Sequence, residues 1–221
     1  MTDIPVLYEN DEIYIINKPS GVSVQGGAGI SHPLDEEFAK QVGQKVYLVH
    51  RLDKDTQGLM IVSKSPQAAS KWTKLISSKQ VQKTYTAYCF GTLSKKKGVI
   101  NDTVIQHGEH KTAVTNYKFL EEKDIKCGDE TVHISKISLE LQTGRMHQIR
   151  IHLSKNNCPI IGDDNHGNFK LNKLIKKEHK IKTLQLYSTR LAVPVDGKNK
   201  VFEIEDGFNL SEAVTPCEIS N

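Results

Sequence analysis

The residues best suited to chemistry stand within four consecutive positions, where His50, Arg51 and Asp53 follow one another closely. Continuous apolar segments at 46–49 and 58–62 flank them and predict strands that are covered on both faces. A carboxylate between two buried strands has a rigid support, which suits a nucleophile or a general base better than a mobile surface loop does. On spacing alone, a loop with a structural ion pair explains the same residues equally well.

Strands and helices predicted along the rest of the chain must hold this loop. Ser65 followed by Pro66 predicts a helix start, and the spacing of the apolar residues around Trp72 predicts that the helix packs on a sheet. A short helix is predicted over 32–42. Polar segments at 94–97 and 121–130 are typical of hairpin tips. The remaining apolar stretches predict strands at 5–8, 13–16, 81–90, 98–105, 112–120, 132–141, 183–193 and 201–204.

Long runs of consecutive strands broken by a few helices indicate an α+β fold with a mixed, mainly antiparallel central β-sheet. The 221 residues, of which 37% are hydrophobic and 25% charged, fit one domain over residues 1–221 and exclude disordered and membrane classes. The net charge of +4 favours polyanionic partners only weakly. No two of the four cysteines form a C-x-x-C pair and no leader is visible, so we expect reduced thiols and a cytoplasmic protein.

The run from 49 to 64 resembles the active-site motif of the RluA-type pseudouridine synthases, H-R-L-D-x-x-T-S-G. It matches at His50, Arg51, Leu52, Asp53, Thr56 and Gly58, and it departs at Gln57, where serine is usual. Four further segments resemble family motifs and follow in the family's order. They are Asn17-Lys18-Pro19-Ser20-Gly21, Lys83-Thr84-Tyr85 with Ala87 and Gly91, the run from Gly144 to His152, and Pro159-Ile160-Ile161-Gly162-Asp163.

The resemblance implies an RNA pseudouridine synthase that needs no cofactor, with a central sheet in two halves flanked by helices. It acts on specific uridines of ribosomal RNA, transfer RNA or both. By the same resemblance Asp53 is the nucleophile or base, Tyr85 stacks on the uracil and serves late proton transfer, and Arg150 pairs with Asp53. Such a pairing makes physical sense, because a nearby arginine keeps an aspartate charged.

Further residues are predicted to bind the substrate. The resemblance suggests that Arg51 fills the gap left by the extruded nucleotide or holds its phosphate, the alternative being a structural salt bridge with an acidic residue such as Asp55. His50 is expected to contact the substrate as well. So are Arg145, His147 and Gln148, on a helix predicted to begin at Arg145 with a buried stripe of Met146, Ile149 and Leu153. A solvated basic helix is the alternative, as it is for the lysines between 170 and 182.

Two positions depart further from the family pattern, namely His166, where tyrosine is usual, and Tyr187-Ser188, where a His-Ala pair is common. Two other functions are weighed. A metal-dependent hydrolase would need a ligand set, but only His107 and His110 stand close together, and we expect no metal. An RNA-binding module without catalysis would not need Asp53, Tyr85 and Arg150 together. We expect a monomer that binds RNA and no membrane.

Overall fold

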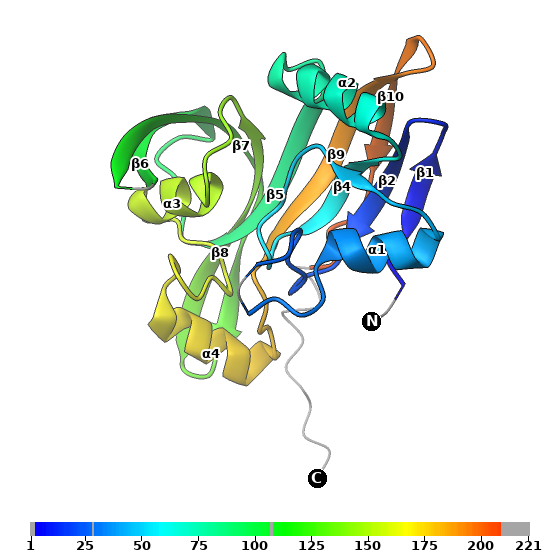
Figure 1. Cartoon of the computed structure of the whole chain (residues 1–221). Coiled ribbons are helices and arrows are strands. Elements are labelled where there is room, and N and C mark those ends of the chain that lie inside the picture. The colour runs from blue at the N-terminus through cyan, green and yellow to red at the C-terminus, as the bar shows by residue number, and fades with distance from the viewer. Residues whose placement is uncertain (1–2, 28, 107, 209–221) are drawn as a thin grey trace. The chain divides into compact units, whose positions relative to one another are not determined.

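The computed structural model describes residues 3–27, 29–106 and 108–208, which form two compact units (Figure 1). Residues up to Tyr85 and from Leu186 to Glu205 form the first unit, and residues from Thr86 to Gln185 and from Asp206 onward form the second. The single domain expected over residues 1–221 stays a prediction. No helix in the described ranges is long and apolar enough to cross a membrane.

The sheet of the first unit has four strands in the order β1-β2-β4-β9, and two more strands pair at its sides. Its neighbouring strands are antiparallel except β4 and β9, which pair in parallel through Gln57–Tyr187 and Gly58–Ser188. The turn before β2 forms because the Asn10 side chain accepts hydrogen bonds from two backbone N–H groups, both at 2.9 Å. The strands are β1 (Val6–Glu9), β2 (Ile13–Lys18), β3 (Tyr47–Leu48), β4 (Gln57–Ser63), β9 (Leu186–Val195) and β10 (Lys198–Glu203).

Helix α2 (Pro66–Ser77) covers the apolar core of this unit. The predicted helix start is confirmed, because the Ser65 hydroxyl accepts a hydrogen bond from the Ala68 N–H at 3.2 Å. Trp72 is buried against strand residues such as Leu59 and Leu191, as its spacing predicted. The other helix of the unit, α1 (Leu34–Val42), lies within the predicted range.

The second unit is built on long antiparallel hairpins, with strand order β5-β8-β7-β6. Strand β5 begins in the first unit and ends in the second. The mixed, mainly antiparallel sheet predicted from the sequence is therefore confirmed. The elements are β5 (Gln82–Phe90), β6 (Lys97–Gln106), β7 (Glu109–Cys127), β8 (Glu130–Leu141), α3 (Gln148–Lys155) and α4 (Phe169–His179).

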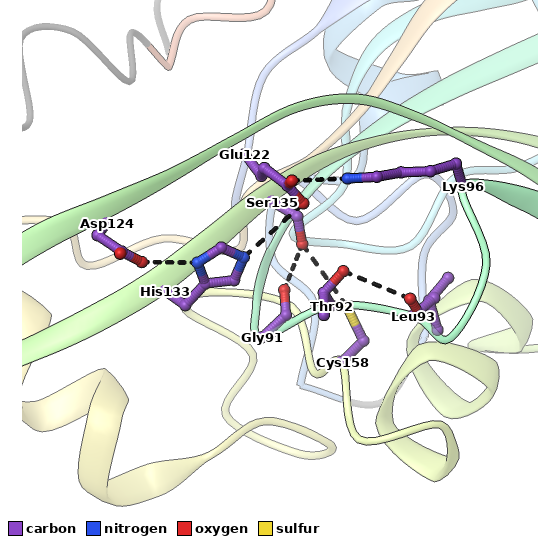
Figure 2. A network of polar contacts seen from close by, with 9 residues as sticks. All are labelled: Gly91, Thr92, Leu93, Lys96, Glu122, Asp124, His133, Ser135 and Cys158. Carbon is purple, nitrogen blue, oxygen red and sulfur yellow. Dashed lines mark hydrogen bonds and ion pairs between the residues drawn. The ribbon is translucent and has the colours of Figure 1, made fainter.

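The hairpin tip predicted at 121–130 is confirmed in place but is shorter than predicted, because β7 continues to Cys127 and the turn to β8 takes only Gly128 and Asp129. Ile125 and Cys127 are buried, whereas Asp124 and Lys126 are exposed, so the segment alternates as a strand should. Figure 2 shows the polar contacts on the exposed face, where Asp124 accepts from His133 across the hairpin at 2.6 Å. The many charged residues in this segment made its alternation of buried and exposed positions hard to recognise in the sequence.

Three expectations about burial are wrong, because the burial of these residues differs from what the spacing of apolar residues along the sequence predicts. Helix α3 begins at Gln148, so Met146 lies outside it and is 53% exposed instead of belonging to a buried stripe. Arg150 and His152 are buried, so the alternative of a solvated basic helix is also wrong. Strand β3 has two half-buried residues and is not a fully covered strand.

Gly58→Ala is expected to destabilise the protein strongly. Gly58 has φ +110°, and a Cβ there would lie 2.3 Å from the Ser188 carbonyl oxygen, so the β4–β9 contact would have to open. The positive φ alone costs about 1–3 kcal/mol, and the clash adds to it. Gly43→Ala is the matched control, because Gly43 has φ +67° with no atom within 4 Å of the added Cβ. Equal losses of unfolding free energy in urea titrations would contradict the clash.

Candidate active site

A buried lysine fixes the loop that carries Asp53. Lys18, the last residue of β2, is fully buried, and its Nζ donates to the carbonyls of Pro19, Val22 and Lys54, each at 2.8 Å. Burial lowers the pKa of Lys18 to about 8, against the opposing pull of nearby aspartates, so the ammonium form with its three hydrogens prevails at neutral pH. The three bonds tie the turn after β2 to the loop before β4.

The same loop is held at four other points. The Ser20 hydroxyl donates to the Asp55 carbonyl at 3.0 Å, and the Thr56 N–H donates to the Asp53 carbonyl at 3.2 Å. Leu52 is buried, and His50 accepts a hydrogen bond at Nε2 from the Ile61 N–H at 3.0 Å. The backbone around Asp53 is therefore fixed on both sides of this residue, which is the preorganisation that a catalytic carboxylate needs.

The charge of Asp53 acts on Tyr85 within the first unit. Burial raises the pKa of Tyr85 well above its ordinary value, and the negative charge of Asp53 adds to the rise. Tyr85 is thus a neutral phenol at any physiological pH, and its ring is suited to stacking. Asp53 itself is half-buried. The structure brings these two predicted residues into one neighbourhood.

Arg51 stands next to the loop's buried residues but is itself exposed. Among the described residues it forms no ion pair, so the alternative reading, a structural salt bridge with Asp55, is wrong. An exposed, uncommitted guanidinium can meet a phosphate group. Its predicted contact with the substrate stays a prediction.

In the second unit, Arg150 forms a buried ion pair with Asp163. Its Nε and Nη2 donate to the two carboxylate oxygens at 2.8 and 2.7 Å, and the side chains are 4% and 1% exposed. Burial acts to raise the pKa of Asp163, but the bonds from Arg150 and from the N–H groups of His166 and Asn165 outweigh it and lower the pKa. Two-pronged pairing fixes the guanidinium plane. The predicted pairing of Arg150 with Asp53, which lies in the other unit, stays a prediction.

Gln148, at the first position of α3, has an amide that is fully used inside the protein. Its oxygen accepts from the Thr143 hydroxyl at 2.7 Å and the Arg145 N–H at 3.0 Å. Its nitrogen donates to the Val114 carbonyl at 3.0 Å and to the Thr115 hydroxyl at 2.9 Å. Gln148 therefore anchors the start of α3 to β7. Its predicted contact with the substrate stays a prediction, and the geometry favours a positioning role.

His147 precedes α3 and meets the residue that departs from the expected tyrosine. Its Nδ1 lies 3.0 Å from Nε2 of His166, with the two rings nearly perpendicular at 78°. One ring must donate and the other accept, so the pair can hold at most one charge without breaking this bond. Arg145 is exposed, and its Nε donates to the Thr112 carbonyl at 3.3 Å. Both predicted RNA contacts stay predictions.

Comparison with known proteins identifies the family and the fold of this chain. The family model described as RNA pseudouridylate synthase matches residues 12–155. The chain belongs to this family. "Ribosomal large subunit pseudouridine synthase C" of Rickettsia felis is 32% identical over 96% of this chain and 70% of that protein. The protein of the same name from Rickettsia bellii is 34% identical over 75% of this chain, which spans only 58% of that relative's length.

A solved structure shows the pseudouridylate synthase fold directly. "Human RNA Pseudouridylate Synthase Domain Containing 1" superposes with a TM-score of 0.77 at 21% identity, covering 97% of this chain and 89% of that one. At this identity the likeness speaks for the fold alone. The expected pseudouridine synthase fold is therefore confirmed.

Two of the departures from the family pattern lie side by side. Gln57 is the register partner of Tyr187 across the parallel pairing of β4 and β9, and Gly58 is the partner of Ser188. Ser188 also donates to the Leu59 carbonyl at 3.0 Å. The changes at Gln57 and Tyr187-Ser188 thus concern one contact, directly after the loop that holds Asp53.

The sequence did not predict the roles of Lys18 and Asp163. Both stand in motifs that were recognised, but a lysine at the end of an apolar strand and an aspartate after a glycine carry no local signal of a buried partner. Among the described residues, no group of three or more histidine, cysteine or acidic side chains could hold a metal ion. His107, named with His110 for the metal alternative, lies outside the described residues.

Lys18→Met is expected to loosen the loop around Asp53. The substitution leaves three carbonyls without their donor, and one unsatisfied buried polar group costs about 1–3 kcal/mol. We expect a loss of at least that size in unfolding free energy, and faster amide hydrogen exchange over residues 50–56. Lys40→Met removes only an exposed contact with Glu37 and serves as the control. Unchanged amide hydrogen exchange in the Lys18 variant would show that the three Lys18 hydrogen bonds do not hold this loop.

Proposed function

We propose that this chain isomerises uridine to pseudouridine in RNA, with Asp53 as the nucleophile or base. The observation that carries the proposal is the rigidly held loop that presents Asp53 in the same unit as the neutral phenol of Tyr85. Family membership supports it. A carboxylate on a fixed backbone can break a glycosidic bond without help from loop reorganisation.

The reaction balances without a cofactor. The bond between N1 of uracil and C1′ of the ribose breaks with the help of Asp53, and the base turns over. C5 then bonds to C1′ in place of N1, C5 gives up its hydrogen to a base or to water, and N1 takes up a proton. We assign stacking on the uracil to Tyr85, because a buried neutral ring offers a flat apolar face. Its part in proton transfer belongs to the same proposal.

We propose ribosomal RNA as the substrate, since the relatives from two Rickettsia species carry that target in their names. Transfer RNA is the other substrate that the sequence led us to expect. Mapping pseudouridines in both RNA fractions of a strain that lacks the gene separates the two. Loss of a site in transfer RNA alone would move the assignment there.

Asp53→Asn is expected to abolish tritium release from C5-labelled uridine in RNA, because an amide cannot serve as nucleophile or base. RNA affinity should stay within a few fold of the unchanged protein. Asp11→Asn, in the exposed turn before β2, is the matched control and should retain activity. Tritium release by the Asp53 variant would show that this residue is misassigned, and an inactive unchanged protein that still binds RNA would overturn the enzyme proposal.

Helix α4 offers a surface for the RNA backbone. Phe169, Lys173 and Lys176 fall at positions i, i+4 and i+7 and so share one face, on which Phe169 is 64% exposed. Neither lysine forms an ion pair within the described part of the chain, whereas Lys170 pairs with Glu130. An exposed aromatic ring in line with two exposed ammonium groups suits a single RNA strand, which stacks bases and presents phosphates.

The double variant Lys173→Gln, Lys176→Gln is expected to bind RNA more weakly, and more so at low salt. Losing two phosphate contacts should reduce the slope of log affinity against log salt by about 1.4–1.8. The measurement is a filter-binding titration at several salt concentrations. The double variant Lys45→Gln, Lys74→Gln, with exposed lysines of the first unit, is the control. An unchanged slope would mean that α4 is a solvated surface.

A further inference from the structure

Lys83 is a cation without a partner in the unit that holds Asp53. It stands two positions before Tyr85 on β5, so both side chains leave the same face of the strand. The side chain is partly buried, and it has no hydrogen bond or ion pair with any described residue. Burial lowers the pKa of Lys83 to about 8, which leaves the ammonium form dominant at neutral pH. A desolvated charge with no partner costs stability.

His50 contributes a second donor without an acceptor. Its Nε2 accepts from the Ile61 N–H at 3.0 Å, so in the neutral ring the proton is on Nδ1. The ring is neutral, because burial lowers the pKa of His50 and the positive charge of Lys83 acts in the same direction. Nδ1 is buried and has no hydrogen-bond partner within the described part of the chain. The positive charge of Lys83 acts on His50, so the two side chains are within electrostatic reach of each other in the first unit.

Two neighbouring donors therefore lack an acceptor, next to the residues of the proposed reaction. Lys18, the other buried lysine of this unit, is satisfied by three carbonyls, whereas the Ser63 hydroxyl is a neutral buried group that also lacks a partner within the described ranges. One donor is a cation, and no acceptor is at hand for either. A ligand that completes the pair must bring an acceptor oxygen with negative charge, and a phosphate group of RNA has both.

We propose that Lys83 and the Nδ1–H of His50 form a subsite for one phosphate oxygen of the RNA backbone. The inference rests on the proposed function for the identity of the ligand as RNA. Arg51, exposed on the same loop, is a separate residue with its own predicted contact. The subsite adds to it a phosphate contact on β5, where the sheet fixes its position, since the Thr189 hydroxyl donates to the Thr84 carbonyl at 3.4 Å.

Lys83→Met and Lys83→Arg test the subsite by RNA binding, which does not depend on turnover. With an unmodified large-subunit ribosomal RNA transcript as the probe, Lys83→Met should weaken binding about five- to tenfold and lower the salt slope by about 0.7–0.9. Lys83→Arg keeps the charge and should bind within about twofold. Lys74→Met, an exposed lysine of the same unit, should match the unchanged protein.

Thermal unfolding without RNA separates a ligand site from a structural role. Because an unpartnered buried ammonium stabilises nothing, Lys83→Met should melt at the same temperature as the unchanged protein or higher. A variant that melts lower or does not fold overturns the subsite. So does a folded variant with unchanged affinity and slope, or one with lower affinity and an unchanged slope, which would indicate a base carbonyl. If the unchanged protein binds RNA but releases no tritium, the proposed function is wrong. The subsite can still be tested in that case, because the Lys83 variants are compared by RNA binding and not by turnover.

Discussion

One buried ammonium group, that of Lys18, governs the position of the loop that carries Asp53. A lysine in the protein interior is costly unless all of its hydrogens are used, and here three carbonyls from two loops use them. Because Lys18 ends a strand whose other residues are packed in the sheet, the loop before β4 takes on the rigidity of that sheet. The carboxylate of Asp53 is thereby placed by the fold and not by its own sequence neighbours.

The second unit also contains a buried charge, in this case the negative charge of the Asp163 carboxylate. The Asp163 carboxylate accepts from the Arg150 guanidinium and from two backbone N–H groups, so the buried pair has few unused sites. Gln148 uses its amide as completely at the start of α3. By contrast, Lys83 and His50 Nδ1 have no partner among the described residues, as is also true of the Ser63 hydroxyl and the His152 ring. Of these groups, Lys83 is the one that carries a charge, which is why we assign it a ligand.

Local signals predicted local structure well. The cap at Ser65, the turn at Asn10 and the strand pair around it are set by neighbours in the sequence, and the structure has them as expected. The sequence did not predict hydrogen bonds between residues that are far apart along the chain. Lys18 meets Lys54 across 36 positions and Gln148 meets Val114 across 34, and no spacing rule reaches so far. The exposed Met146 was misplaced because side-chain contacts of Gln148, and not an apolar stripe, determine where α3 begins.

The first unit is interrupted in the sequence, and this affects how the protein is made. Strand β4 finds its parallel partner only in β9, about 130 residues later, and the second unit likewise joins residues from Thr86 to Gln185 with a segment that begins at Asp206. During synthesis the chain emerges from its N-terminus, and domains close as their residues become available. Both units therefore complete their folds late in synthesis, and Asp53, although made early, gains its finished surroundings only when the segment from Leu186 arrives.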